Sequence, residues 1–387
     1  MDSDVLQQYV QALNIEMQST AAGLSSSVTR NENFVAMSNT DEARIIAICT
    51  PMMKRVHRMI KHSGELVFVD AGGNMDRQNT RVFLLLTHSA AGGLPLGVLL
   101  VSNEQCDTIT AALRLYMSLL DDSCFGGRGP NGPVMFMTDD SASERNALKT
   151  VFRESVLLLC AFHILQAYWQ FLWDNKTNVK RESRQQLFMV LKSMLYATSM
   201  EQLCMLFHNA IGNAIVAIHP KVVRHLQSLY DRRSEWALCC RSDLPIRGNH
   251  TNNFCESAMR VMKDKVFEGT KAFNVQQLID FIATRMDSHY QRRLIDAANN
   301  RLDLDQRSHY VPKTSTIDST TIRKIDDDTY EVPSEKSNGV VYLVDMSVGC
   351  CGCPVGNTGG PCKHQAAVMK AFHLQSWNFL PTVDADM

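Results

Sequence analysis

The sequence predicts an α/β protein that consists of a β-sheet with helices on its faces, an all-helical insertion, and a small module rich in Cys and His. Three observations support this fold class. Short runs of Val, Leu, Phe and Met between 65 and 162, bounded by Gly, Ser, Asn or Asp, predict strands. From His163 to about 245 the apolar spacing is helical throughout. Four cysteines and one histidine crowd together between 350 and 364.

The predicted elements follow an order typical of a sheet with crossover helices. Two helices are expected within a helical leader at 1–62, the second over 42–60. A sheet domain over 63–300 contains the insertion at about 164–245. Residues 301–325 lack periodicity and are predicted to be a linker before the Cys- and His-rich module at 326–376. The expected strands lie at 65–73, 81–89, 94–102, 134–140 and 156–162, with helices at 108–122 and 142–154.

Composition narrows the class of protein. No run of about 18 apolar residues exists and the N-terminus is acidic and amphipathic, so we expect neither a membrane-spanning nor a secreted protein. The cysteines outside the cluster are scattered, which is typical of a reducing compartment. A net charge of -1 lacks the basic excess of proteins that bind nucleic acid mainly by neutralising phosphates. Any DNA contact must therefore come from local patches.

The cluster near the C-terminus has the spacing of a structural zinc site. Cys351-x-Cys353 is followed after eight residues by Cys362-x-His364, with Gly and Pro between the pairs. Thiolates and imidazole at this density select tetrahedral zinc, and four protein ligands leave no open position for catalysis. Cys350 also stands at CxxC spacing from Cys353 and is an alternative ligand.

Three acidic residues stand where a second, catalytic metal site is expected. Asp70 ends the first strand of the sheet domain and Asp139 ends the fourth, while Glu256 lies early in the helix that follows the insertion. Carboxylates that converge from neighbouring strand ends can hold the two Mg²⁺ or Mn²⁺ ions of phosphoryl transfer. Taken singly, each residue also suits a structural role, because Asp is a common turn residue and Glu near a helix start favours the helix dipole.

Four segments carry a resemblance to a known family: the strand ending in VDA, the TDD followed by ERNAL, the LLCAFHILQAYW segment and the TNNFCES helix. In this order, over about 48–300, they resemble the transposase core of Mutator-like elements. The resemblance implies a ribonuclease-H-like fold whose DDE triad falls on Asp70, Asp139 and Glu256. Asp76 and Asp140 are competing choices. Asp139 is preferred because the family's second acid directly follows Thr at the strand end.

Two further motifs match known patterns. The same family has a Cys-x-x-His after its fifth strand, here Cys160 and His163, for which we expect core packing or phosphate positioning because no second ligand pair lies nearby. The CxC and CxH pairs, with a hairpin before and a helix after, resemble the SWIM zinc finger. That resemblance favours Cys351 over Cys350.

The resemblance implies DNA recombination: DNA strand cleavage and strand transfer in the nucleus, with water or a 3′-hydroxyl as nucleophile. It implies transposon ends as the DNA partner, an oligomer if the enzyme is active, and protein partners for the SWIM finger. A domesticated descendant that binds DNA or protein and regulates transcription is the alternative, and an inactive relic is the third. Residues 1–60 contain Cys49 as their single cysteine and lack the N-terminal zinc domain usual in these proteins, so the chain looks truncated.

Without that domain, DNA contact is expected from the SWIM finger, the helical insertion and two basic stretches. Basic residues at helical spacing are also typical of a solvated helix face. Three aromatic residues of the insertion recur at helical spacing and are predicted to be core, with stacking on a flipped base as the alternative. The basic stretches are Lys54, Arg55, Arg58 and Lys61, and Arg260, Lys263 and Lys265, and the aromatic residues are Tyr168, Trp169 and Trp173.

Overall fold

The computed structural model describes residues 3–24, 32–40, 42–73, 75–267, 269–299, 301, 317–337, 339–347, 349–357, 360–374 and 378. They divide into two compact units, one within Met1–Val156 and Asn253–Val311, the other within Leu157–Asn252 and Pro312–Leu374. Most of the linker predicted at 301–325 lies outside the described residues.

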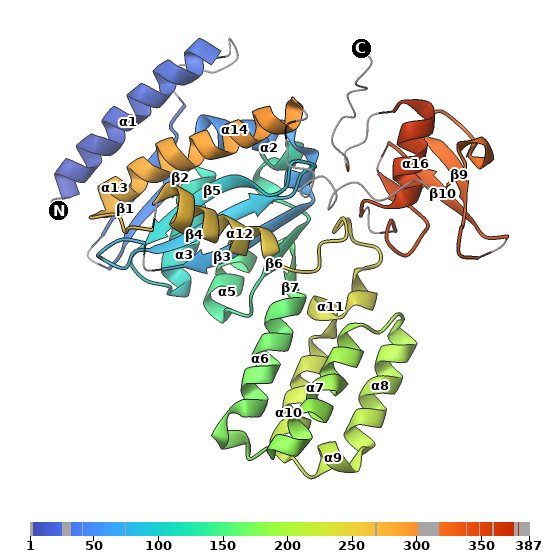
Figure 1. Ribbon diagram of the computed structural model, residues 1–387. Helices are drawn as coiled ribbons and strands as arrows, with labels where there is room; N and C mark the ends of the chain where they lie inside the picture. Colours follow the sequence, from blue (N-terminus) through green and yellow to red (C-terminus); the bar gives the residue numbers. More distant parts are fainter. Residues whose placement is uncertain are drawn as a thin grey trace. The chain divides into compact units, whose positions relative to one another are not determined.

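A seven-stranded sheet is the central element of the fold (Figure 1). Its strand order is β1-β2-β5-β4-β3-β6-β7. The strands are β1 (Val35–Asn39), β2 (Arg44–Ile48), β3 (Leu66–Gly72), β4 (Arg81–Thr87), β5 (Leu94–Val101), β6 (Met135–Thr138) and β7 (Val156–Leu159).

The helices of the first unit cover this sheet. They are α1 (Ser3–Leu24), α2 (Pro51–Met59), α3 (Cys106–Met117), α4 (Cys124–Gly127), α5 (Ala142–Val151), α12 (Asn253–Val261), α13 (Val275–Asp280) and α14 (Asp287–Ala298). Wider turns at Met262–Val266 and Phe281–Met286 continue α12 and α13, and 3₁₀ turns lie at Lys61–Gly64 and Gly129–Asn131. No helix in the described part of the chain is long and apolar enough to cross a membrane.

The predicted three-strand meander is confirmed. β3 pairs antiparallel with β4, and β4 with β5. All residues of β5, and most of β3 and β4, are buried, as expected for strands covered on both faces. The strands expected at 134–140 and 156–162 are β6 and β7, and β6 pairs parallel with β3. A parallel pair requires a long crossover, which α3 and the segment after it provide.

The helix predicted over 42–60 is wrong in its first half. Residues 44–48 form β2, which pairs antiparallel with both β1 and β5. The helix begins only at Pro51, where the Thr50 side chain accepts a hydrogen bond from the Met53 N–H. The apolar run at 44–48 is too short for its spacing to distinguish a helix from a strand. Pairing with two neighbouring strands satisfies the hydrogen-bonding groups of its backbone.

Helices α12 and α3 lie on opposite faces of the sheet. On one face the Phe68 ring packs against Phe254 of α12, with ring centroids 5.2 Å apart. On the other face Tyr116 of α3 fills the space over Gly97, where a Cβ atom would lie 2.3 Å from the Tyr116 ring. The strand register aligns Gly97 with Leu85 and Val69, and because side chains alternate, Val69 and Phe68 face opposite sides.

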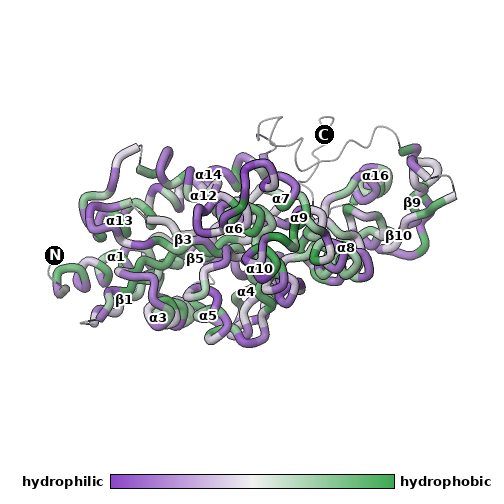
Figure 2. The backbone as a smooth tube through the Cα atoms, turned by 90° about the horizontal axis from the view of Figure 1, so that it is seen from below, coloured by the Kyte–Doolittle hydropathy of each residue, from purple (hydrophilic) through white to green (hydrophobic). Residues whose placement is uncertain are grey.

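The all-helical insertion predicted at about 164–245 is confirmed. Its buried core contains Tyr168, Leu191, Leu226 and Trp236. In Figure 2 its helices carry both hydrophobic and hydrophilic residues, as expected for helices that bury one face. The helices are α6 (Ala161–Trp173), α7 (Arg181–Leu195), α8 (Met200–Gly212), α9 (Ala214–Ala217), α10 (Pro220–Asp231) and α11 (Arg233–Trp236), with 3₁₀ turns at Asn175–Thr177 and Leu238–Arg241.

The aromatic residues of α6 do not all lie in this core. Tyr168 is fully buried, as predicted, but Trp169 and Trp173 are 39% and 45% exposed. The core prediction is therefore wrong for the two tryptophans. Their rings pair with each other at 5.6 Å, and the Arg184 guanidinium lies 4.3 Å from the Trp173 ring. Helical spacing identifies which residues share a face, but not which face the neighbouring helices cover.

The C-terminal module is a four-stranded sheet with one helix. Its strand order is β11-β10-β9-β8, and the predicted hairpin corresponds to β9 and β10. The elements are β8 (Arg323–Lys324), β9 (Thr329–Pro333), β10 (Val341–Asp345), β11 (Cys350–Cys351) and α16 (Lys363–Phe372), preceded by a 3₁₀ turn at Ser319–Thr321.

Arg241 is a buried residue in the 3₁₀ turn near the end of the helical insertion. Its side chain is fully buried. Its guanidinium donates to the carbonyl oxygens of Leu159, Glu235 and His250, and so joins the beginning and the end of the insertion. Burial lowers the pKa of this guanidinium to about 10, so it stays charged at neutral pH.

We predict that Arg241→Met lowers the free energy of unfolding by about 3 kcal/mol, because it leaves several buried carbonyl groups without a donor. Denaturant unfolding followed by circular dichroism measures this loss. Arg224→Met, at an exposed position of α10, is the matched control and should cost less than about 0.5 kcal/mol. Equal losses in the two variants would contradict the role of Arg241.

Candidate metal centres

Four side chains converge in the C-terminal module. One ligand atom from each of Cys351, Cys353, Cys362 and His364 lies within 4.8 Å of the others, and all four residues are buried. The Cys351 Sγ and the His364 Nδ1 are 3.8 Å apart. Three thiols and an imidazole at this separation match the donor set of a tetrahedral structural zinc site.

The surrounding backbone supports thiolate ligands. The Gly356 N–H points to the Cys353 Sγ at 3.2 Å, and the Gln365 N–H points to the Cys362 Sγ at 3.5 Å. The fully buried Gln365 side chain donates to the carbonyl oxygens of Gly349 and Gly360. These contacts hold both ends of the ligand loop, as outer partners of metal ligands do.

Cys350 does not belong to this cluster in the described residues. Cys350 and Cys351 form the short strand β11, in which Cys351 pairs with Val344 and is buried while Cys350 is partly exposed. Because neighbouring side chains of a strand point to opposite faces, only one of the two cysteines can face the other ligands. The structure places Cys351 in the cluster.

A second set of candidate metal ligands comes from the neighbouring strands β3 and β6 of the seven-stranded sheet. The parallel register aligns Leu66 with Met135 and Phe68 with Met137. Continued by two residues, it places Asp70 beside Asp139 at the carboxyl ends of β3 and β6. Asp70 is partly buried in β3, while Asp139 follows directly after β6 and accepts a hydrogen bond from the Ser141 N–H at 3.0 Å.

Helix α12 packs over the face of β3 that carries Asp70. Phe68, Asp70 and Gly72 alternate to this face. Phe68 contacts Phe254, and a Cβ atom at Gly72 would lie 2.9 Å from the Met259 Sδ. Asp70 therefore lies between two contacts to α12, under the turn that contains Glu256.

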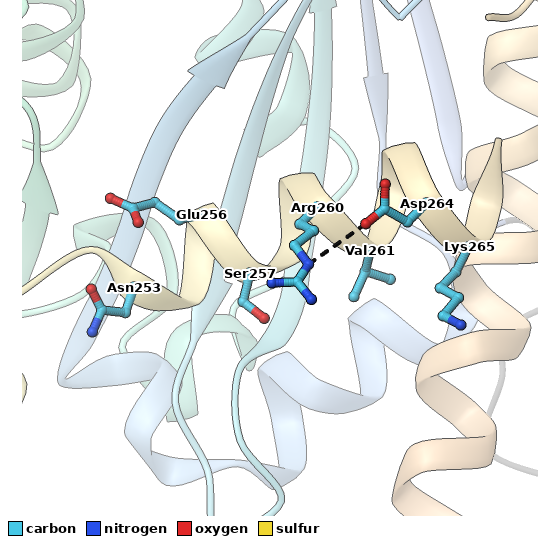
Figure 3. A pocket seen from close by; sticks show the side chains of 7 residues that line it. All are labelled: Asn253, Glu256, Ser257, Arg260, Val261, Asp264 and Lys265. Carbon is cyan, nitrogen blue, oxygen red and sulfur yellow. Dashed lines mark ion pairs between the residues drawn. The ribbon is translucent and has the colours of Figure 1, made fainter. Parts of the chain in front are cut away.

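The Glu256 side chain itself is exposed. It lines a pocket of ≈ 620 Å³ together with other residues of the same helix (Figure 3). Among the described residues, the carboxyl groups of Asp70, Asp139 and Glu256 do not form a cluster with all ligand atoms within 4.8 Å. Asp70 lies in β3, Asp139 directly follows β6, and Glu256 is an exposed residue of α12.

The two competing acids have different surroundings. Asp76 is buried, and its carboxylate accepts hydrogen bonds from the Thr80 N–H at 2.8 Å and from the Thr80 hydroxyl at 2.6 Å. It thus stabilises the loop between β3 and β4. Asp140 is exposed.

The Cys160 and His163 pair lies at the start of α6. Cys160 is buried and its Sγ accepts from the Asn252 N–H at 3.2 Å. Burial raises the pKa of the Cys160 thiol, but hydrogen bonds to His163 and to backbone N–H groups outweigh it and lower the pKa below its ordinary value. Neither residue belongs to a metal-ligand cluster in the described part of the chain. Their arrangement fits the expected packing role.

The first basic stretch is largely neutralised within the protein. Lys54 is buried and its Nζ lies 3.2 Å from a Glu32 carboxylate oxygen. Arg58 pairs with Glu32 at 3.1 Å and also with Asp121. Arg55 and Lys61 are the two exposed cations of this stretch.

The second basic stretch lies on the exposed side of α12 and the turn that follows it. Arg260 and Lys265 line the same pocket as Glu256, and the Arg260 Nε lies 3.6 Å from Asp264 (Figure 3). Lys263 is exposed as well.

Two groups in the structure were not predicted. His62, Glu65 and His88 lie within 4.8 Å of one another, but the two imidazole rings stack with centroids 4.4 Å apart and planes only 15° apart. Rings stacked in this way cannot both direct an in-plane nitrogen at one ion, so we interpret the group as packed core. The second is the buried Glu144 of α5, which stands in a Ser-x-x-Glu pattern although the Ser141 N–H donates to Asp139 rather than to Glu144.

Comparison with known proteins identifies the C-terminal module. The SWIM zinc finger family model matches residues 341–372, which include all four clustered ligands. No curated protein matches the sequence. The match and the cluster together indicate zinc binding by this module.

We predict one zinc per chain, bound through Cys351 and its three partners. Cys351→Ser should lose the metal, because it removes a thiolate that no other side chain replaces. Cys350→Ser is the matched control and should retain the zinc content of the wild type. Elemental analysis by mass spectrometry after gel filtration measures both, and loss of zinc in Cys350→Ser alone would contradict the ligand assignment.

Proposed function

We propose that this chain is a DDE-type transposase, or a protein derived from one, of the Mutator-like class. The observation that supports the proposal is the parallel pairing of β3 with β6, in which Phe68 is aligned with Met137; Asp70 and Asp139 each follow this aligned pair by two residues. Carboxylates from two neighbouring strand ends are the arrangement from which polynucleotidyl transferases build a divalent metal site.

The strand order supports a ribonuclease-H-like core. The five strands β5-β4-β3-β6-β7 consist of an antiparallel three-strand meander followed on its far side by β6, parallel to β3. The helical insertion lies between β7 and α12, and α12 then returns to the face of the sheet that carries Asp70.

In this proposal Asp70, Asp139 and Glu256 hold Mg²⁺ or Mn²⁺, for which carboxylate oxygens are suitable ligands. The bound ions supply activation of the attacking oxygen and charge stabilisation of the leaving oxygen. The protein's own contribution is positioning: the Ser141 N–H orients the Asp139 carboxylate, and Glu256 is exposed on α12.

The proposed partner is DNA, in the nucleus, at transposon ends or regulatory sites. Arg260 and Lys265, which line the pocket beside Glu256, are suited to phosphate contacts (Figure 3). The SWIM finger is proposed to bind DNA or protein, and an active enzyme is proposed to work as an oligomer.

A regulator of transcription without catalytic activity is the second candidate. Two observations favour it: the carboxylate of Glu256 is not gathered with the two aspartates in the described residues, and the family match is confined to the zinc module. A transposase-derived regulator would retain the fold and the zinc finger, but its three carboxylates would no longer need to converge on a metal ion.

We predict that the zinc-loaded full chain cleaves or joins oligonucleotides carrying the ends of its own element when Mn²⁺ or Mg²⁺ is present. Asp70→Asn and Asp139→Asn should each lower this activity by about a hundredfold or more, because each removes a charged metal ligand. Product formation is measured on denaturing gels with labelled DNA.

Asp140→Asn is the matched control, since it removes a neighbouring exposed carboxylate, and it should retain wild-type activity. Activity that persists in Asp70→Asn and Asp139→Asn would contradict the triad. No activity in the wild type, together with specific DNA binding, would favour the regulator.

A further inference from the structure

Cys239 and Cys240 are adjacent cysteines near the end of the helical insertion, in the 3₁₀ turn Leu238–Arg241. Both are free thiols and both are partly exposed. The side chain of Met200, the first residue of α8, lies against them. Its Sδ is 3.3 Å from the Cys240 Sγ and 3.9 Å from the Cys239 Sγ. Three sulfur atoms from two segments that are distant along the chain therefore meet in the insertion.

The separation of these sulfur atoms is close to that of ligands on one metal ion. Sulfur ligands that each lie about 2.3 Å from an ion are about 3.8–4.0 Å from one another in tetrahedral or trigonal geometry. The contacts of the Met200 Sδ, at 3.3 and 3.9 Å, are equal to this separation or slightly shorter. A small opening of the side chains therefore lets all three sulfur atoms reach one ion. Without an ion the contacts contribute little, because a thiol is a weak donor and a thioether a weak acceptor.

The backbone that carries the three side chains is fixed on both sides of the group. The turn with the two cysteines ends at Arg241, whose buried guanidinium donates to three backbone carbonyl oxygens. Helix α8 begins at Met200, behind the Ser199 cap, whose hydroxyl accepts from the Gln202 N–H at 3.1 Å. Ligands on fixed elements are held near the geometry that an ion requires.

The set of donors determines the class of ion. Among the described residues, no histidine, carboxylate or third cysteine forms a metal-ligand group with these two thiols. A structural zinc site takes four protein ligands, and Mg²⁺ or Ca²⁺ takes oxygen ligands. Two thiols and a thioether are soft donors, which select Cu(I).

The two thiols are poorly placed for a disulfide with each other. Consecutive Cα atoms are about 3.8 Å apart, whereas the Cα atoms of disulfide-bonded cysteines are usually about 4.4–6.8 Å apart. Burial, and then the charge of the neighbouring Cys240, raise the pKa of the Cys239 thiol to about 11. This thiol is therefore protonated at neutral pH, and an ion must displace its proton.

We propose that Cys239, Cys240 and Met200 form a binding site for one Cu(I) ion. Each thiol releases its proton and binds as a thiolate, and the thioether supplies the third sulfur. The bound ion links the start of α8 to the 3₁₀ turn. The site lies entirely within the helical insertion, so the inference does not depend on the proposed function.

The test is an anaerobic titration of the zinc-loaded full chain with Cu(I), in competition with the chromogenic chelator bicinchoninate. Bound copper and retained zinc are both measured by mass spectrometry after gel filtration. We expect one Cu(I) per chain without loss of zinc. Cys240→Ser should lower the affinity about a hundredfold and Met200→Leu about tenfold, because each removes a sulfur ligand. Leu has nearly the volume of Met, so the second variant changes little else.

Met205→Leu and Cys106→Ser are the matched controls. Met205 is an exposed methionine of the same helix, and Cys106 is a partly exposed cysteine at the start of α3. Both variants should keep the wild-type affinity for Cu(I). If Cys240→Ser does not fold, as judged by circular dichroism, Cys239→Ser should show the same loss of affinity.

Three results would overturn the site. The first is wild-type affinity in Met200→Leu or in a folded variant of either cysteine. The second is copper binding that occurs only as zinc is released, since the copper then occupies the ligands of the zinc cluster. The third is the absence of Cu(I) binding by the wild-type chain.

Discussion

The parallel pairing of β3 with β6 is the contact on which the rest of the acidic site depends. β3 runs from Leu66 to Gly72 and β6 from Met135 to Thr138, and their register aligns Phe68 with Met137, the residues two positions before Asp70 and Asp139. A slip of one residue would turn every side chain of β6 to the other face. All four residues of β6 are buried and Phe136 packs on Phe152 with ring centroids 5.0 Å apart, so such a slip would disrupt a packed core.

The zinc cluster and the proposed acidic site differ in how the fold forms them. The zinc cluster is made within 14 consecutive residues, 351–364, so its geometry depends on a local loop held by Gln365. With four protein ligands it is closed, which suits a structural metal. The acidic residues of the proposed site come from β3, the end of β6 and α12, so their geometry depends on the tertiary fold.

This difference explains what the sequence could predict. The zinc ligands were predicted from their spacing, and the SWIM resemblance favoured Cys351 over Cys350; the prediction was possible because local order along the chain determines the cluster. The helical insertion was predicted because helical spacing persists over many residues, and the meander because its apolar runs are bounded by Gly, Ser, Asn or Asp. The strand at Arg44–Ile48 was not, because five residues between a polar turn and Thr50-Pro51 fit a helix or a strand equally well, and only pairing with β5 decides between them.

For the acidic residues, the sequence predicts positions along the chain but not which side chains are buried. Asp70 and Asp139 follow apolar strands, and that signal is visible in the sequence. The exposure of Glu256 and the burial of Glu144 are not visible, because both stand early in a helix with similar patterns around them. Which of the two faces the sheet is decided by the packing of α5 and α12.

The most direct test of the central claim, that Asp70 and Asp139 share one cation, is to locate the ion in the folded chain. Fe²⁺ bound in place of Mg²⁺ generates hydroxyl radicals in the presence of ascorbate and peroxide, and these cleave the backbone next to the site. The account predicts cuts near 70 and 139 that excess Mg²⁺ suppresses and that Asp139→Asn abolishes. Cuts elsewhere, or cuts that Mg²⁺ does not suppress, would contradict it.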